Sequence, residues 1–278
     1  MTKSPRPIQP RVWTSLALAS VTLATSPALA NMTPAPFTLA MPQARIWLAQ
    51  AEGGEAGEAG EAGEAGITKA APEDTAYLTE LMIIHGHMRA ARDLYAIGDK
   101  DIAVKLSKHP QEEGTLAALQ VKIATYKAQD VADEIATFTD TMAKGGAQDA
   151  VDQAAAQVAQ AFAAAASVKD TQIRARFDAV VLLVKAAAGE YQASITDGKV
   201  EDLMGWHEAW SFIDIARAEL TDLSSQPLSA KAAPKALKPL EDVNAAFGDP
   251  MAAVPLAGDP QILLGVAAKL ELIASSVR

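Results

Sequence analysis

Residues 74–113 read DTAYLTELMIIHGHMRAARDLYAIGDKDIAVKLSKHPQEE. Asp74 or Thr75 can cap a helix there by accepting hydrogen bonds from free backbone N–H groups. The helix is expected to run to about Ile97, because Gly98 supplies the left-handed residue that commonly ends a helix. The stretch therefore predicts one long helix, and the signals that follow it along the chain are of the same type.

Two further helices follow within and beyond this stretch. Asp99 or Asp101 can start a short helix that ends before His109. Pro110 suits the first turn of a new helix, where its missing N–H costs nothing, and that helix is expected to run to about Gln129.

The rest of the chain also predicts helices, and no stretch shows convincing alternation with a period of two. Prolines at 227, 234 and 239 predict a loop between two of them. The fold class is therefore all-α, an antiparallel helical bundle with halves at about 73–167 and 168–278. The expected later helices cover about 130–144, 149–167, 170–197, 200–221, 239–247 and 260–277.

Residues 1–30 have the pattern of a secretory signal. Three basic residues precede an apolar run at 13–24, and Ala-Leu-Ala at 28–30 is a small-residue cleavage motif. An apolar run of about 12 residues is too short to cross a bilayer, which needs about 20. Cleavage is expected after residue 30 or after residue 51. The sequence thus predicts a periplasmic or secreted protein with no membrane span after signal cleavage.

Residues 31–72 predict a disordered acidic linker. Their repeat EGGEAGEAGEAGEAG, at 52–66, has no bulky apolar side chain that could offset the entropy of ordering it. Five glutamates there can hold cations loosely, but the segment is more typical of a solvated tether.

Composition excludes several classes of protein. The 278 residues contain no cysteine, which rules out disulfides, thiolate metal sites, cysteine nucleophiles and covalently attached c-type haem. The net charge is −10, and removing residues 1–30 leaves 21 basic and 34 acidic residues, a net charge of −13. A surface this acidic repels nucleic acid. No phosphate-binding loop, nucleophile elbow or His-Glu-x-x-His motif predicts an enzymatic reaction.

Three of the four histidines lie in residues 74–113 and suggest metal binding. Met82, His85 and Met88 are three residues apart, so they share one stripe of the predicted helix. Thioethers with an imidazole suit Cu(I) or a haem-facing surface, but the same stripe is also typical of a core in which methionine fills gaps. His87 lies on another face, so His85 and His87 are expected to have different roles.

A second ligand group follows the first helix. His109, Glu112 and Glu113 offer an imidazole and two carboxylates, which suit iron, manganese or zinc. Acidic residues also favour a helix start without any metal. Because adjacent helices pack together, His87 or His85 is expected to complete a site with His109 and Glu113.

The fourth histidine, His207, lies between Trp206 and Trp210. The two tryptophans predict an aromatic ridge, used either in core packing or as a contact with another helix. His207 and Glu208 point about 100° apart on a helix, so both are not expected to face inward.

The stretch EYQASITDGKVEDLMGWHEAWSF, residues 190–212, resembles the helical periplasmic domain attached to some bacterial high-affinity iron permeases. The histidine-rich first half also resembles exported helical iron-uptake proteins of the imelysin-like kind, although their Gly-x-His-x-x-Glu signature is absent. Gly205 stands where the permease-associated pattern has an acid. The resemblance implies an iron-binding role and a membrane permease as partner. The matching positions are Tyr191, Asp197, Gly198, Lys199, Val200, Trp206, Glu208 and Phe212.

Together these features predict an exported helical protein that binds a transition metal, iron before copper, in metal uptake or buffering. The alternative is a helical adaptor without metal that docks on a membrane or periplasmic protein through Trp206 and Trp210. Haem between the His85 and Met88 stripes is a third reading. The expected ligands are His85, His87, His109, Glu112 and Glu113, with Met82 and Met88 added for Cu(I).

Overall fold

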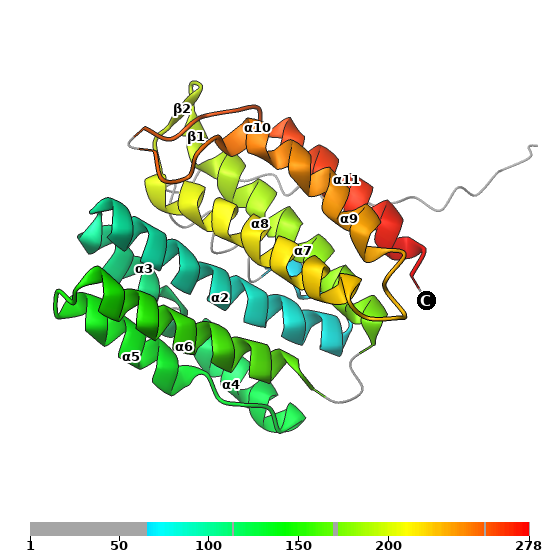
Figure 1. The fold of residues 1–278 in the computed structure, drawn as a ribbon, viewed down its shortest axis with the longest axis horizontal. Helices are drawn as coiled ribbons and strands as arrows, with labels where there is room; N and C mark the ends of the chain where they lie inside the picture. The colour runs from blue at the N-terminus through cyan, green and yellow to red at the C-terminus, as the bar shows by residue number, and fades with distance from the viewer. Residues whose placement is uncertain (1–65, 113, 169–171, 253, 278) are drawn as a thin grey trace, which may run out of the picture. The chain divides into compact units, whose positions relative to one another are not determined.

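The computed structural model describes residues 66–278 except 113, 169–171, 253 and 278. The predicted signal segment, and the predicted linker up to residue 65, lie outside the described residues. The described chain is a helical bundle with one two-residue-long strand pair, so the all-α prediction is confirmed (Figure 1).

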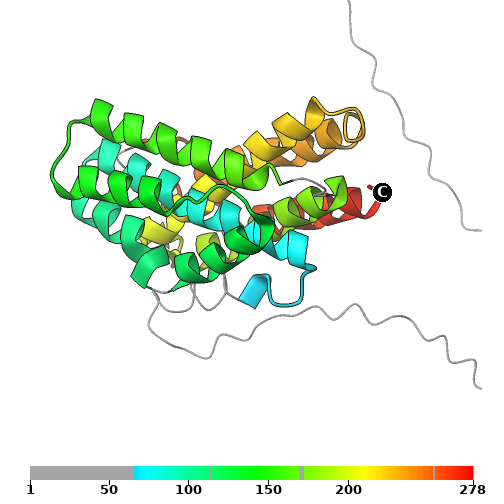
Figure 2. The same ribbon diagram turned by 90° about the horizontal axis from the view of Figure 1, so that it is seen from below.

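Helix α2 (Glu73–Ile97) is the central helix of the bundle. In Figure 1 it runs between α6 on one side and α8 on the other, and Figure 2 shows the same bundle from below. It packs against α3, α6, α7 and α8. Gly98 ends it at φ 102°, where the glycine N–H bonds the carbonyl of Tyr95, as the sequence predicts.

The other helices follow in chain order, most of them close to the predicted ranges. The first half of the chain contains α3 (Lys100–Glu112), α4 (Thr115–Tyr126), α5 (Ala132–Ala143) and α6 (Gln148–Ala166). The second half contains α7 (Ile173–Ala193), α8 (Leu203–Ser224), α9 (Ala233–Leu240), η1 (Glu241–Val243), α10 (Asn244–Phe247) and α11 (Gln261–Ser275).

The predicted helix break before Pro110 is wrong. Helix α3 continues through His109 and Pro110 and ends at Glu112, and the chain reverses at Gly114, whose φ is 76°. Pro110 removes only one backbone hydrogen bond in the last turn of α3, and its buried ring offsets part of that loss. His109 therefore lies in the last turn of α3 and not at a helix start.

A small hairpin separates α7 from α8. Strands β1 (Ile195–Thr196) and β2 (Lys199–Val200) pair antiparallel around Asp197 and Gly198, which have φ values of 50° and 73°. Two successive positive φ angles are typical of a type I′ turn, which explains the Asp-Gly sequence. The side chain of Asp202 then caps α8 by accepting hydrogen bonds from the N–H groups of Met204 and Gly205.

Two predicted loops are partly helical or packed. The last residues of the predicted linker lie against α2, where Thr68 is buried and its hydroxyl donates to Glu80. The proline-rich segment also folds, since α9 begins around Pro234 and contains Pro239. Pro234 suits a first turn, where its N–H has no partner to lose.

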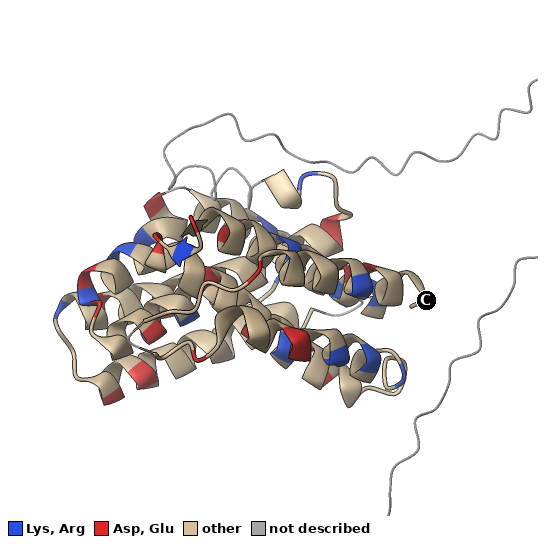
Figure 3. Ribbon diagram, turned by 90° about the horizontal axis from the view of Figure 1, so that it is seen from above, with Lys and Arg blue, Asp and Glu red and all other residues tan. Residues whose placement is uncertain are grey.

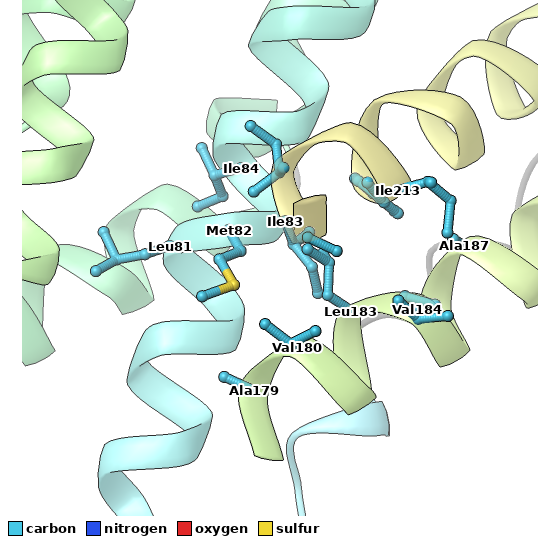
Figure 4. Packing of buried hydrophobic residues seen from close by; sticks show 14 of the residues in the cluster. Leu81, Met82, Ile83, Ile84, Ala179, Val180, Leu183, Val184, Ala187 and Ile213 are labelled. Carbon is cyan, nitrogen blue, oxygen red and sulfur yellow. The ribbon is translucent and has the colours of Figure 1, made fainter. Parts of the chain in front are cut away.

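The two predicted halves share one hydrophobic core. Figure 4 shows Ile83 of α2, Leu183 and Val184 of α7, and Ile213 of α8 gathered in the space between these helices. The described residues accordingly belong to one compact unit. The first half contributes α2 to a core that the second half completes.

The surface of this unit carries charges of both signs. Figure 3 shows acidic and basic segments interspersed along the outer helices. Exposed ion pairs join neighbouring elements, as between Lys269 and Asp242 and between Lys185 and Glu271. Among the described residues, no helix is both long and apolar enough to cross a lipid bilayer.

Tyr77 makes the stability of this core decrease at alkaline pH. Its hydroxyl donates to the carbonyl of Ala165 at 2.9 Å, its ring stacks on Tyr126, and burial raises its pKa to about 12. The unfolded chain loses this proton near pH 10, whereas the folded chain keeps it until about pH 12. The stability that Tyr77 contributes is therefore fully present below pH 10 and declines by up to about 2.7 kcal/mol as pH rises to 12.

Urea unfolding of Tyr77→Phe and the parent chain between pH 8 and 11.5 measures this effect. The parent is expected to lose stability more steeply than the variant above pH 10. Parallel curves for the two proteins would contradict the assignment.

Candidate functional site

His87 lies on the face of α2 that meets α8, with only 5% of its surface exposed. Its Nδ1 is 3.1 Å from the carbonyl oxygen of Ile83, and its Nε2 is 3.3 Å from Oε1 of Glu208. A carbonyl oxygen only accepts, so the Nδ1–H donates to Ile83. The ring is thereby oriented with Nε2 toward the carboxyl group.

The contact between His87 and Glu208 needs a proton or a metal ion between its two atoms. Burial, followed by the charge of His109, lowers the pKa of His87 to about 3, so the ring is neutral near pH 7. A neutral imidazole with a proton on Nδ1 presents a lone pair at Nε2. That lone pair and a carboxyl oxygen repel each other unless a proton or a metal ion lies between them.

The structure brings His109 next to this pair. His109 comes from α3, is 7% exposed, and its ring centre lies 6.5 Å from that of His87. The packing of α2 against α3 therefore places two of the predicted ligands together in the protein interior.

A glycine on α2 permits the close approach of α8. A Cβ at Gly86 would lie 2.5 Å from Cε1 of Phe212 and closer still to its Cδ1. Phe212 is fully buried and also meets the ring of His87 edge-on, with ring centres 5.7 Å apart. Glu208 lies one helical turn before Phe212, so this contact sets its carboxyl group opposite His87.

His85, Met82 and Met88 lie on a different face of α2, as their spacing predicts. The ring of His85 stacks on Phe162 of α6, with centres 5.1 Å apart and planes 10° apart. Burial, and then the nearby charge of Arg89, lower the pKa of His85 to about 4. Met82 and Met88 are buried in the hydrophobic core. The structure thus separates the His85 stripe from His87.

His85 also lines a groove that runs above α2. The groove has a volume of about 620 Å³ and lies between α6 on one side and α7 and α8 on the other. In Figure 1, α2 is visible between the ribbons of α6 and α8. The groove is lined mostly by apolar side chains, and its lining also includes Arg176, Glu219 and Asp222.

Of the two predicted glutamate ligands, the structure describes only Glu112, which is not part of the buried cluster. Glu112 is exposed at the end of α3, and Glu113 lies outside the described residues. Because α3 continues past Pro110, the free N–H groups expected beside Glu112 are absent from this point of the chain.

The prediction that only one of His207 and Glu208 faces inward is wrong. His207 is 1% exposed and Glu208 is 5% exposed, because α8 packs against α2 and α7 and also against α9. Burial lowers the pKa of His207 to about 4, and its Nδ1 has no hydrogen-bond partner among the residues that the structure describes.

The predicted tryptophan ridge is not a surface feature at Trp206. Trp206 is fully buried, and its indole N–H donates to the carbonyl of Leu256. Trp210 is partly buried, packs edge-on against Phe247 and has the Arg217 guanidinium over its ring. These contacts use the tryptophans within the molecule, as in the core-packing interpretation of the ridge.

Within the described residues, no three or more His, Asp or Glu side chains are arranged so that, as they stand, they could hold a metal ion together. The ring of His109 is too far from the His87–Glu208 contact for all three to reach one ion without movement.

Comparison of the chain with protein-family models, with curated proteins and with solved structures finds no match.

Sequence reasoning identified His87 and His109 but not Glu208 as their neighbour. Glu208 follows a histidine and lies between two tryptophans, so its local sequence resembles any amphipathic helix. The feature that points to Glu208 is the pair Gly86 and Phe212, which marks a close contact between α2 and α8. Such a pair is recognised only when the packing of α2 against α8 is known.

Proposed function

We propose that this is an exported helical protein that binds one transition metal ion, iron before copper, at His87, His109 and Glu208, and takes part in metal uptake or buffering. The contact between Nε2 of His87 and Oε1 of Glu208 carries the proposal. Two histidines and a carboxyl group from three helices meet in a protein interior, where polar groups are costly unless partners compensate them.

The spacing of the two atoms supports a metal ion between them. Ligand atoms about 2.1 Å from one ion lie roughly 3.0–3.4 Å apart when they subtend 90–109° at the metal. The 3.3 Å separation of His87 Nε2 and Glu208 Oε1 falls in this range. An ion there would replace the proton that otherwise bridges the two groups.

His109 would then have to move. Two imidazoles on one tetrahedral ion have ring centres roughly 5 Å apart, whereas those of His87 and His109 are 6.5 Å apart. A shift of roughly 1.5 Å at the end of α3 closes this difference. Metal binding is therefore expected to draw the last turn of α3 toward α2 and to stabilise the fold.

The test is anaerobic titration of the natively secreted chain, purified without chelator or His-tag, with Fe(II) and with Cu(I). About one equivalent is expected to bind. His109→Ala is expected to weaken that affinity by about 100-fold or more, since loss of an outer-shell partner alone costs 10–100-fold. At a ligand concentration of 100 Kd the parent chain should gain about 2.7 kcal/mol of stability.

His85→Ala is the matched control, because His85 lies on the same helix but faces α6. It should leave metal affinity within a factor of two. No bound metal and no shift in melting temperature with either ion would overturn the proposal, as would equal losses in His85→Ala and His109→Ala.

A further inference from the structure

Glu190 on α7 is a second buried carboxyl group near the proposed site. Of the acidic residues that the structure describes, only Asp93, Glu190 and Glu208 are buried. Asp93 has an arginine partner, because its Oδ1 lies 3.6 Å from Nη1 of Arg92. Glu190 on α7 and Glu208 on α8 both lie on helices that pack against α2.

The carboxyl group of Glu190 lies beside the first turn of α8. A Cβ at Gly205 would be 3.4 Å from Oε2 of Glu190. Gly205 precedes Glu208 by three residues, so the two positions share a face of α8 within one helical turn. Glu190 is thus directed toward the same part of α8 from which Glu208 contacts His87.

The packing of the helices directs Glu190 and His87 toward the same part of α8. Figure 4 shows Ile83 of α2 beside Leu183 of α7, and Ala187 of α7 beside Ile213 of α8. One turn further along α2 is His87, and one turn further along α7 is Glu190. Because α8 runs in the opposite direction, the residues one turn before Ile213 include Ala209, which adjoins Glu208.

We infer that Glu190 supplies a second carboxylate ligand, which makes the site a two-histidine, two-carboxylate centre for a divalent ion such as Fe(II) or Mn(II). This inference rests on the proposed function and specifies the class of ion. Carboxylates favour hard and borderline divalent ions, whereas Cu(I) favours the thioethers of Met82 and Met88. Both thioethers are buried in the core on the other face of α2.

The ligand set also balances charge. A divalent ion between two ionised glutamates and two neutral imidazoles is a neutral centre, which a buried position tolerates far better than a net charge. With Cu(I) the same set carries a net charge of −1. The buried position therefore favours a divalent over a monovalent ion.

The experiment compares Glu190→Gln with Glu201→Gln, an exposed glutamate beside the hairpin. Each full chain is titrated anaerobically with Fe(II), Mn(II) and Cu(I), and each apo-protein is checked for its helical content and melting temperature. Glu190→Gln is expected to lower the affinity for Fe(II) and Mn(II) by at least 10-fold. Glu201→Gln is expected to bind both ions with the affinity of the parent. The parent should bind Fe(II) more tightly than Cu(I).

The outcomes separate the two proposals. If the parent binds one equivalent and Glu190→Gln binds it within a factor of two, the role of Glu190 is overturned while the site at His87, His109 and Glu208 stands. If the parent binds only Cu(I), the ion class is overturned. If it binds no metal, the proposed function itself fails.

A second variant covers the case in which Glu190→Gln does not fold. Glu190→Asp keeps the carboxylate but withdraws it by one methylene group, so it should lower Fe(II) affinity several-fold. Unchanged affinity in this variant would also count against Glu190.

Discussion

Gly86→Ala is expected to destabilise the protein by about 3 kcal/mol, the upper range for overpacking a core. At an ordinary helix position the same change stabilises a protein by up to about 1 kcal/mol. The sign reverses here because the new methyl group would overlap the ring of Phe212, which is fully buried. The two helices must separate, and the separation also pulls Glu208 away from His87.

Gly189→Ala is the matched control for this prediction. Gly189 is also helical, but it is exposed, and a Cβ there would meet nothing within 4 Å. It should stabilise the chain by about 0.5–1 kcal/mol in urea unfolding followed by circular dichroism. A double variant, Gly86→Ala with Phe212→Ala, should cost less than the sum of its parts. Gly86→Ala within 0.5 kcal/mol of the parent would refute the close contact.

Trp206→Ala is expected to cost about 4 kcal/mol, the middle of the range for removing a buried tryptophan. The substitution opens a cavity beside Phe247 and His207, whose rings meet Trp206 at 5.2 and 5.1 Å between centres. It also leaves the carbonyl of Leu256 without its indole donor. The loop after α10 then loses a contact to α8.

Trp206→Phe separates the two parts of this effect. Phenylalanine restores much of the ring packing but cannot donate a hydrogen bond to Leu256. Trp206→Phe should therefore lose only about half as much stability as Trp206→Ala. Urea unfolding at neutral pH measures both variants. A loss below about 1 kcal/mol in Trp206→Ala would mean that Trp206 is exposed, and would restore the docking ridge as an interpretation.

The ends of several helices were predictable because single residues determine them. Gly98 and Gly145 act through their own backbone angles, and each ends a helix close to where the sequence places that end. Pro110 has an equally strong local signal, yet α3 continues through it. There the burial of His109 and Pro110 outweighs the local preference, and burial is not a local property.

In the candidate site, too, the part that depends on chain order was predictable, and the part that depends on helix packing was not. His87 and His109 lie on successive helices, so the sequence order alone brings them together. Glu190 and Glu208 join them through the packing of α7 and α8 on α2, which depends on a glycine and a phenylalanine 126 positions apart. No local pattern contains that information.

The central place of α2 has a consequence for how the chain folds as it is made. Its apolar faces are completed by α7 and α8, and His87 meets a residue 121 positions later. At 5–20 residues per second, α8 leaves the ribosome roughly 6–24 s after the middle of α2. Until α7 emerges, α2 has only the helices of the first half as partners, and the face that α8 covers stays open for longer. A chain shortened before residue 200 should therefore expose the uncovered face of α2 and depend on chaperones to stay in solution.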